Sequence, residues 1–135
     1  MDSFNWKKLT LAAIMVALGS AYGNPNNILM GNSNFVSGNA NRLMGNYNQL
    51  GGSFNTVLGD GNYLQGYRNT LAGNGNGVTG NRNFVGGNSN VVTGNVNQAF
   101  GDSNNIAGNR NYVEGSNNVV ESGQYSPYSG NIRRY

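Results

Sequence analysis

The chain has 135 residues, the length of one small domain, with a formal net charge of +3 and only 10 % charged residues. It contains 22 Gly and neither Cys nor His, which excludes disulfides, thiol nucleophiles, imidazole bases and the commonest zinc ligands. The weak, scattered positive charge argues against nucleic-acid binding. We therefore expect a protein that is not an enzyme, with no catalytic residues, no metal and no cofactor.

Residues 1–23 have the composition of a secretory signal peptide. Two lysines precede an apolar run over 9–18, and small residues follow it, so cleavage is expected after Ala21 or Gly23. A retained membrane anchor is the alternative, but the run is shorter than the roughly 20 apolar residues that span a bilayer. We expect a secreted, extracellular protein with no membrane association once the signal is removed.

Residues 24–121 repeat every seven residues, as in the consecutive units GNRNFVG, GNSNVVT and GNVNQAF of residues 80–100. Gly begins every unit from Gly31 to Gly115. The fourth place is always Asn and the sixth is always apolar, whereas the third, fifth and seventh places vary. A pattern held in step over this length indicates one regular structure that all the units share.

The period of seven does not fit a helix. A coiled coil needs two apolar places per heptad, and Gly costs a helix about 1 kcal/mol per occurrence relative to Ala. Collagen has a period of three and is rich in Pro. A short strand followed by a turn remains: the fourth and sixth side chains share one strand face, the fifth and seventh share the other, and Gly with Asn forms the turn.

One such unit buries nothing alone, so the units must stack as a solenoid. The four arginines of the repeat region all lie in alternate units, which favours two units per coil. The sequence predicts an all-β fold, a flattened β-solenoid or β-roll of about seven coils, roughly 33 Å long at the spacing of β-strands. Its interior would hold aliphatic rows beside stacked, hydrogen-bonded Asn side chains.

Residues 122–135 leave the repeat. This segment, SGQYSPYSGNIRRY, carries the last two arginines of the chain. Solenoids need a cap at each end, and chain termini are also common sites of disorder. We therefore expect either a cap on the last coil or a disordered tail.

Written to end on its Gly, the unit is x-x-N-x-[VLI]-x-G, seen in SNFVSG (33–38) and SNVVTG (89–94). This pattern closely resembles the repeats, x-x-N-x-V-x-G, of the ice-binding, ice-recrystallisation-inhibiting antifreeze proteins of perennial ryegrass and related cool-season grasses. The resemblance covers residues 24–121. It implies a left-handed β-roll that is secreted and adsorbs to the ice crystal surface through one flat face. The chain departs from that family in its outward places, several of which hold Phe, Tyr, Gln, Arg or Met rather than Thr, Ser or Val.

The flattest outward patches of the predicted roll contain pairs of Thr. Hydroxyl and methyl groups that repeat at the coil spacing can order water at an ice-like spacing, although adjacent Thr residues are also ordinary on any β-rich surface. The candidate ice-binding residues are Thr79, Thr93, Val91 and Asn105 on one face, and Thr56 and Thr70 on the opposite face.

The exposed aromatic residues suggest a different class of function. Phe35 and Tyr63 are expected two coils apart on one face, and Phe84 and Tyr112 two coils apart on the other, each pair about 9.6 Å apart. Such rings can stack on a cell-wall polysaccharide or contact a surface partner, or they can simply pack across strands. A structural, adhesin-like repeat protein that associates through its ends is a third alternative, although we expect a monomer rather than an oligomer.

Overall fold

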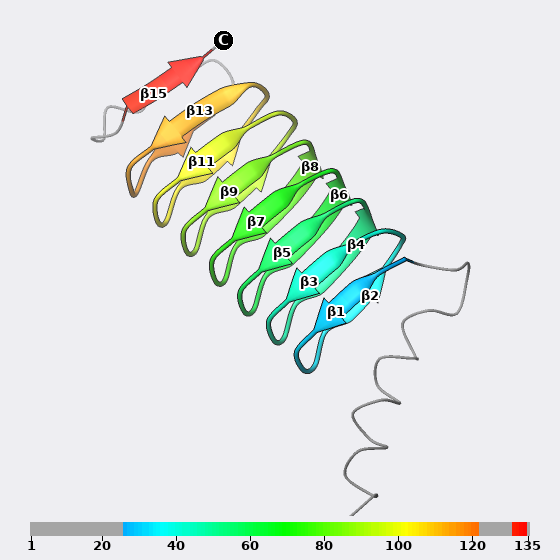
Figure 1. The fold of residues 1–135 in the computed structure, drawn as a ribbon. Helices are drawn as coiled ribbons and strands as arrows, with labels where there is room; N and C mark the ends of the chain where they lie inside the picture. Colours follow the sequence, from blue (N-terminus) through cyan, green and yellow to red (C-terminus); the bar gives the residue numbers. More distant parts are fainter. Residues whose placement is uncertain (1–25, 122–130, 135) are drawn as a thin grey trace, which may run out of the picture.

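The computed structural model describes residues 26–121 and 131–134, so the predicted signal peptide lies outside the described residues. The chain winds in flat coils, and each coil adds one short strand to each of two sheets that lie back to back (Figure 1). Strands of one sheet pair with a shift of 14 residues, for example Ile28 with Arg42. The predicted all-β roll, with two seven-residue units per coil, is therefore confirmed. No helix among the described residues could span a membrane.

The two sheets take alternate units of the repeat, and we call them sheet A and sheet B. Sheet A contains β1 (Ile28–Met30), β3 (Arg42–Met44), β5 (Thr56–Leu58), β7 (Thr70–Ala72), β9 (Phe84–Gly86), β11 (Gln98–Phe100), β13 (Asn111–Glu114) and β15 (Asn131–Arg134). Sheet B contains β2 (Phe35–Ser37), β4 (Gln49–Ser53), β6 (Tyr63–Tyr67), β8 (Gly77–Asn81), β10 (Val91–Thr93), β12 (Asn105–Ala107) and β14 (Val119–Val120). Neighbouring strands are parallel except β13 and β15, which are antiparallel.

The core is a double row of aliphatic side chains between the sheets. A three-residue strand directs its middle side chain inward and the two others outward, and the middle residue is the sixth place of the unit. These side chains are 0–3 % exposed, and they are Val36, Leu43, Leu50, Val57, Leu64, Leu71, Val78, Val85, Val92, Ala99, Ile106, Val113 and Val120. Each coil therefore buries its apolar side chains only by stacking on its neighbours.

The fourth-place Asn side chains form two buried ladders beside this core, as predicted. From Asn41 to Asn118 they are 0–6 % exposed. Asn76 illustrates the pattern: its backbone N–H donates to the Oδ1 of Asn62 (2.9 Å), and its Nδ2 donates to the same Oδ1 (3.1 Å) and to the carbonyl of Gly87 (2.8 Å). Because the amide supplies both an acceptor and a donor, the buried polar groups of the turn are paired from coil to coil.

The first place of the unit must be Gly because the coils approach closely there. Gly80 has a φ of +127°, and a Cβ atom on it would lie 1.8 Å from the carbonyl oxygen of Gly94 in the next coil. Any larger residue would push these two coils apart. The same carbonyl of Gly94 accepts the Nδ2 of Asn83, so the Gly and Asn places depend on each other.

A second, exposed ladder runs along the turns. We call the turns that lead into sheet A edge A, and those that lead into sheet B edge B. On edge B the second-place side chains accept hydrogen bonds from the backbone of the preceding coil, as when Asn46 Oδ1 accepts the N–H of Asn32 (2.9 Å). The acceptors in this ladder are the side chains of Asn46, Asp60, Asn74, Asn88, Asp102 and Ser116. In this ladder each backbone N–H donates to a side chain of the following coil, whereas in the buried ladders each backbone N–H donates to a side chain of the preceding coil.

The two sheets end differently at the last coil. Residues 131–134 form β15, which lies antiparallel on β13 and so covers the end of sheet A (Figure 1). Residues 122–130 of the predicted cap or tail lie outside the described residues. In sheet B the Oδ1 of Asn118, the last amide of its ladder, is buried without a hydrogen-bond partner in the part of the chain that the structure describes. Among the described residues no strand follows β14 in sheet B, because residues 131–134 pair with β13 of sheet A instead.

Candidate functional site

The outer face of sheet B carries a flat patch over β8, β10 and β12. Two rows of side chains cross these strands, as given by the strand register. The first row is Thr79, Thr93 and Ala107, and the second row is Gly77, Val91 and Asn105. We call these six residues the threonine patch. Positions within a row are about 4.8 Å apart, and the rows are about 6.6 Å apart along the strands.

The threonine patch is both exposed and rigid. Thr79, Thr93 and Asn105 are exposed, and half of Val91 is accessible to solvent. The carbonyls of Thr79 and Thr93 each accept a backbone N–H from the next coil at 2.9 Å. Thr and Val are branched at Cβ and restricted at χ1, so the positions of their methyl and hydroxyl groups are set by the backbone.

The structure places the six predicted ice-binding residues on two different faces. Four of them, on sheet B, belong to the threonine patch. Thr56 and Thr70 are direct neighbours on the outer face of sheet A and are half-buried. Arg42 precedes this pair and Phe84 follows it in the same row, so the flat area on sheet A is only two strands wide. Sequence reasoning missed Gly77 and Ala107, which keep the sheet B patch flat because they have almost no side chain.

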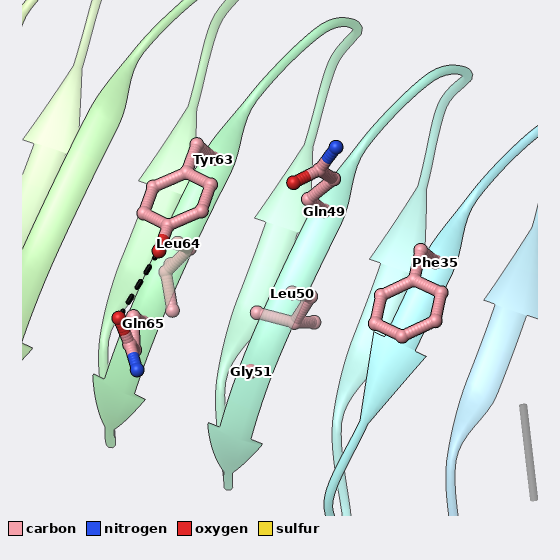
Figure 2. Close-up of a pocket in the computed structure, with 7 residues that line it drawn as sticks. All are labelled: Phe35, Gln49, Leu50, Gly51, Tyr63, Leu64 and Gln65. Atoms are coloured by element: carbon pink, nitrogen blue, oxygen red, sulfur yellow. Dashed lines mark hydrogen bonds between the residues drawn. The ribbon is translucent and has the colours of Figure 1, made fainter.

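The first half of sheet B is rougher. Phe35 and Tyr63 lie two strands apart on this face, as predicted, and border a shallow hollow of about 140 Å³ (Figure 2). Gln49 lies between them in the same row, Gly51 leaves space in the row beside it, and the hydroxyl of Tyr63 donates to Oε1 of Gln65 (3.0 Å). Phe35 is 66 % exposed and Tyr63 is 47 % exposed. These rings limit the flat area of sheet B to the strands after β6.

The aromatic residues of sheet A pack against one another. Phe84 and Tyr112 lie two strands apart, as predicted, and Phe100 lies between them with its ring 5.4 Å from Phe84 and 5.9 Å from Tyr112, measured between ring centroids. The hydroxyl of Tyr112 donates to Oε2 of Glu114 (3.1 Å). Contacts of this geometry stabilise a sheet, so the arrangement favours the cross-strand packing interpretation for these rings.

No cluster suited to metal binding occurs within residues 26–121 and 131–134: these contain no group of three His, Cys, Asp or Glu that could hold an ion. Asp60 and Asp102 instead belong to the exposed ladder of edge B. Each accepts a backbone N–H through Oδ1, from Asn46 at 2.6 Å and from Asn88 at 2.7 Å. Their positions are explained by this structural role.

The fold and these surfaces define a regular β-solenoid whose outer face carries a rigid, flat, threonine-bearing patch. The model of the grass antifreeze beta roll family matches residues 21–130. The chain belongs to this family of ice-binding proteins, which is not a known enzyme family. The resemblance found in the repeats is thereby confirmed. No curated protein matches the chain.

Proposed function

We propose that the protein is secreted and inhibits the recrystallisation of ice by adsorbing to ice crystals through the threonine patch of sheet B. One observation carries the assignment of this face: three adjacent strands present two straight rows of short side chains at a fixed spacing. The family match supports ice as the ligand.

The chemistry of the patch suits a surface of ordered water. Hydroxyl groups of Thr79 and Thr93 can hydrogen-bond to water in the first layer, and the methyl groups of the same residues and of Val91 restrict where that water lies. Bridging waters of this kind are nearly as favourable as direct hydrogen bonds. Because the side chains are already fixed by the backbone, little conformational entropy is lost on adsorption.

The width of the flat area favours sheet B over sheet A. Adsorption to a crystal plane requires many contacts made at once, and the threonine patch extends over three strands whereas the Thr56–Thr70 pair extends over two. A cationic side chain (Arg42) and a large ring (Phe84) border the sheet A pair in its own row. The sheet A pair is therefore the smaller candidate contact and a suitable control.

The proposal is tested by an assay of ice recrystallisation with the purified protein and two double variants. The substitutions Thr79→Tyr and Thr93→Tyr place two bulky rings on the threonine patch, and Thr56→Tyr with Thr70→Tyr does the same on sheet A. We expect the parent to keep ice grains small and the sheet B variant to lose most of this effect. The sheet A variant should retain it. Circular dichroism establishes that each variant is folded.

Two results would contradict the proposal. Ice grains that grow in the presence of folded parent protein as they do in buffer would rule out ice as the ligand. Equal loss of inhibition in the two double variants would rule out sheet B as the specific face. Secretion is tested separately by expressing the full chain in a secreting host and sequencing the N-terminus of any exported protein, which is expected to begin after Ala21 or Gly23.

A further inference from the structure

Three arginines stack along edge A. Arg68, Arg82 and Arg110 each hold the third place of a turn leading into sheet A, and all three are exposed. Arg68 and Arg82 lie in adjacent coils, and Arg110 lies two coils further on, with Val96 in the coil between. At the spacing of neighbouring strands this gives a row of cations separated by about 4.8 Å and about 9.6 Å.

Three of the four carboxylates within residues 26–121 lie away from this row. Asp60 and Asp102 belong to edge B, and Glu114 stands at the seventh place of its unit on the outer face of sheet A. The fourth, Glu121, follows the last strand of sheet B at the same place of the repeat as Ala107, next to edge A and beyond the coil of Arg110. Within residues 26–121, the second and third places of edge A contain no Asp or Glu. Arg68 and Arg82 stand in turns of adjacent coils and repel each other, and a bound anion would offset this repulsion.

The backbone conformation at these positions does not account for the arginines. Arg68, Arg82 and Arg110 have φ values of 57°, 57° and 56°, in the left-handed region. The third places of other units adopt the same conformation with residues as different as Ala40, Tyr47, Phe54, Val96 and Gly61. The turn therefore accepts many residue types and does not itself require arginine on edge A.

A hollow of about 460 Å³ lies beside the arginine row. Its lining residues are Tyr67, Asn81, Arg82, Asn95 and Val96. The Nδ2 of Asn81 donates to Oδ1 of Asn95 (3.0 Å), and an amide nitrogen carries two hydrogens, so a second hydrogen is available to a ligand. The lining thus combines a guanidinium group, amides and an apolar side chain.

The ring of Tyr67 is already in contact with its neighbours. The ring of Phe54 meets it edge-to-face at 5.3 Å, and the guanidinium carbon of Arg68 lies 5.0 Å from its centroid. Proteins that bind single-stranded nucleic acid use aromatic faces on which bases stack, but the ring of Tyr67 is already engaged by these two contacts. The groups that remain for a ligand on edge A are guanidinium and amide donors, which suit carboxylates or sulfates and hydroxyl groups.

We infer that edge A binds a linear anionic polysaccharide. Its carboxylate or sulfate groups pair with Arg68, Arg82 and Arg110, and its hydroxyl groups hydrogen-bond to the amides in the hollow. The planar guanidinium matches such anions with two parallel hydrogen bonds, and a polymer lying along the edge meets a cation in three of these four coils. Edge A lies beside the outer face of sheet B, and its arginines and hollow share no residue with the threonine patch.

The test measures binding of the purified protein to immobilised polymers by biolayer interferometry, in 50 mM and 300 mM NaCl. Polygalacturonate presents carboxylates, dextran sulfate presents sulfates, dextran is the neutral control, and single-stranded DNA represents the competing class. The variants are Arg82→Gln, the triple variant Arg68→Gln/Arg82→Gln/Arg110→Gln, and Arg42→Gln. The last removes the same charge from the outer face of sheet A.

We expect salt-sensitive binding to at least one of the two anionic polysaccharides and none to dextran. The stronger of the two identifies carboxylate or sulfate as the preferred anion. The triple variant should bind at least tenfold more weakly and Arg82→Gln at least threefold more weakly, whereas Arg42→Gln should change affinity by less than 1.5-fold. The triple variant should keep the parent's circular dichroism spectrum and its effect on ice.

Three results would overturn the inference. The first is no binding of either anionic polysaccharide in 50 mM NaCl. The second is a loss of binding in Arg42→Gln as large as that in Arg82→Gln, which would mean that net charge alone acts. Tighter binding to single-stranded DNA than to both polysaccharides would assign the edge to nucleic acid instead.

Discussion

Replacing Asn83 by Leu tests whether the buried ladder holds the coils together. Asn83 is 2 % exposed. Its Oδ1 accepts the N–H of Asn97 (2.9 Å), and its Nδ2 donates to the carbonyl of Gly94 (2.8 Å). Leu has a similar shape but forms neither bond, so the substitution leaves one donor and one acceptor of the next coil unpaired.

The magnitude follows from these two groups. Each buried group without a partner costs about 1–3 kcal/mol, and the buried Leu side chain returns about 1.5–3 kcal/mol through the hydrophobic effect. At the middle of these ranges the two groups cost about 4 kcal/mol and the Leu returns about 2 kcal/mol, so the net loss of unfolding free energy is about 2 kcal/mol. For a domain of this size each kcal/mol lowers Tm by roughly 4–8 °C, so Tm should fall by roughly 8–16 °C.

Thermal unfolding followed by circular dichroism measures this effect, with Asn88→Leu as the matched control. Asn88 is exposed on edge B, and its Oδ1 accepts the N–H of Asn74 at 3.0 Å. Water replaces a hydrogen bond lost at the surface, so this variant should lose less than about 1 kcal/mol. A Tm for Asn83→Leu equal to that of the parent, or no lower than that of Asn88→Leu, would refute the role assigned to the buried amides.

Two further substitutions test the close approach of the coils and the ring cluster. Gly80→Ala should destabilise the protein by at least about 3 kcal/mol, because its Cβ would meet the carbonyl of Gly94 at 1.8 Å. Gly77→Ala is the control, because no atom lies within 4 Å of the added Cβ, and its Tm should stay within a few degrees of the parent. Equal losses of Tm in Gly80→Ala and Gly77→Ala would contradict this reasoning. Phe100→Ala removes two ring contacts, each worth about 0.5–1.5 kcal/mol, so chemical denaturation should show a loss of about 1–3 kcal/mol; an unchanged midpoint would mean that the rings only cover the sheet.

The repeat made the interior of the fold predictable. Every unit has an aliphatic residue at the sixth place, such as Leu71, and an Asn two residues before it, such as Asn69. Only a strand and turn that direct both side chains inward account for this pairing in every unit. The exposed ladder of edge B was not predicted, although its signal was present: Asn46 and Asn74 hold the same second place, and Asp60 between them keeps an acceptor oxygen. The sequence also gave no indication that β15 is antiparallel, because residues 131–134 lie outside the repeat.

The candidate site was less accessible from sequence. The period places Thr79 beside Thr93, and the register agrees. The contribution of Gly77 and Ala107 depends on a side chain that is missing or very small, which pattern analysis does not single out. The ring contacts of Phe100 depend on side-chain rotamers, which the period of the sequence does not determine. The role of Thr79 and Thr93 in ice binding stays a prediction until the double variants are measured.

The equivalence of the two half-coils has a consequence for insertions and deletions. Both half-coils place the same residue types inside, so loss of any seven residues in the repeat would preserve the aliphatic rows and the amide ladders. It would also transfer every later strand to the opposite sheet. Loss of residues 80–86, for example, would put Thr93 on the face opposite Thr79, whereas loss of a whole 14-residue coil before Thr79 would shorten the roll and leave the patch intact. Changes in length that conserve a binding face are therefore restricted to multiples of fourteen residues, although the core tolerates multiples of seven.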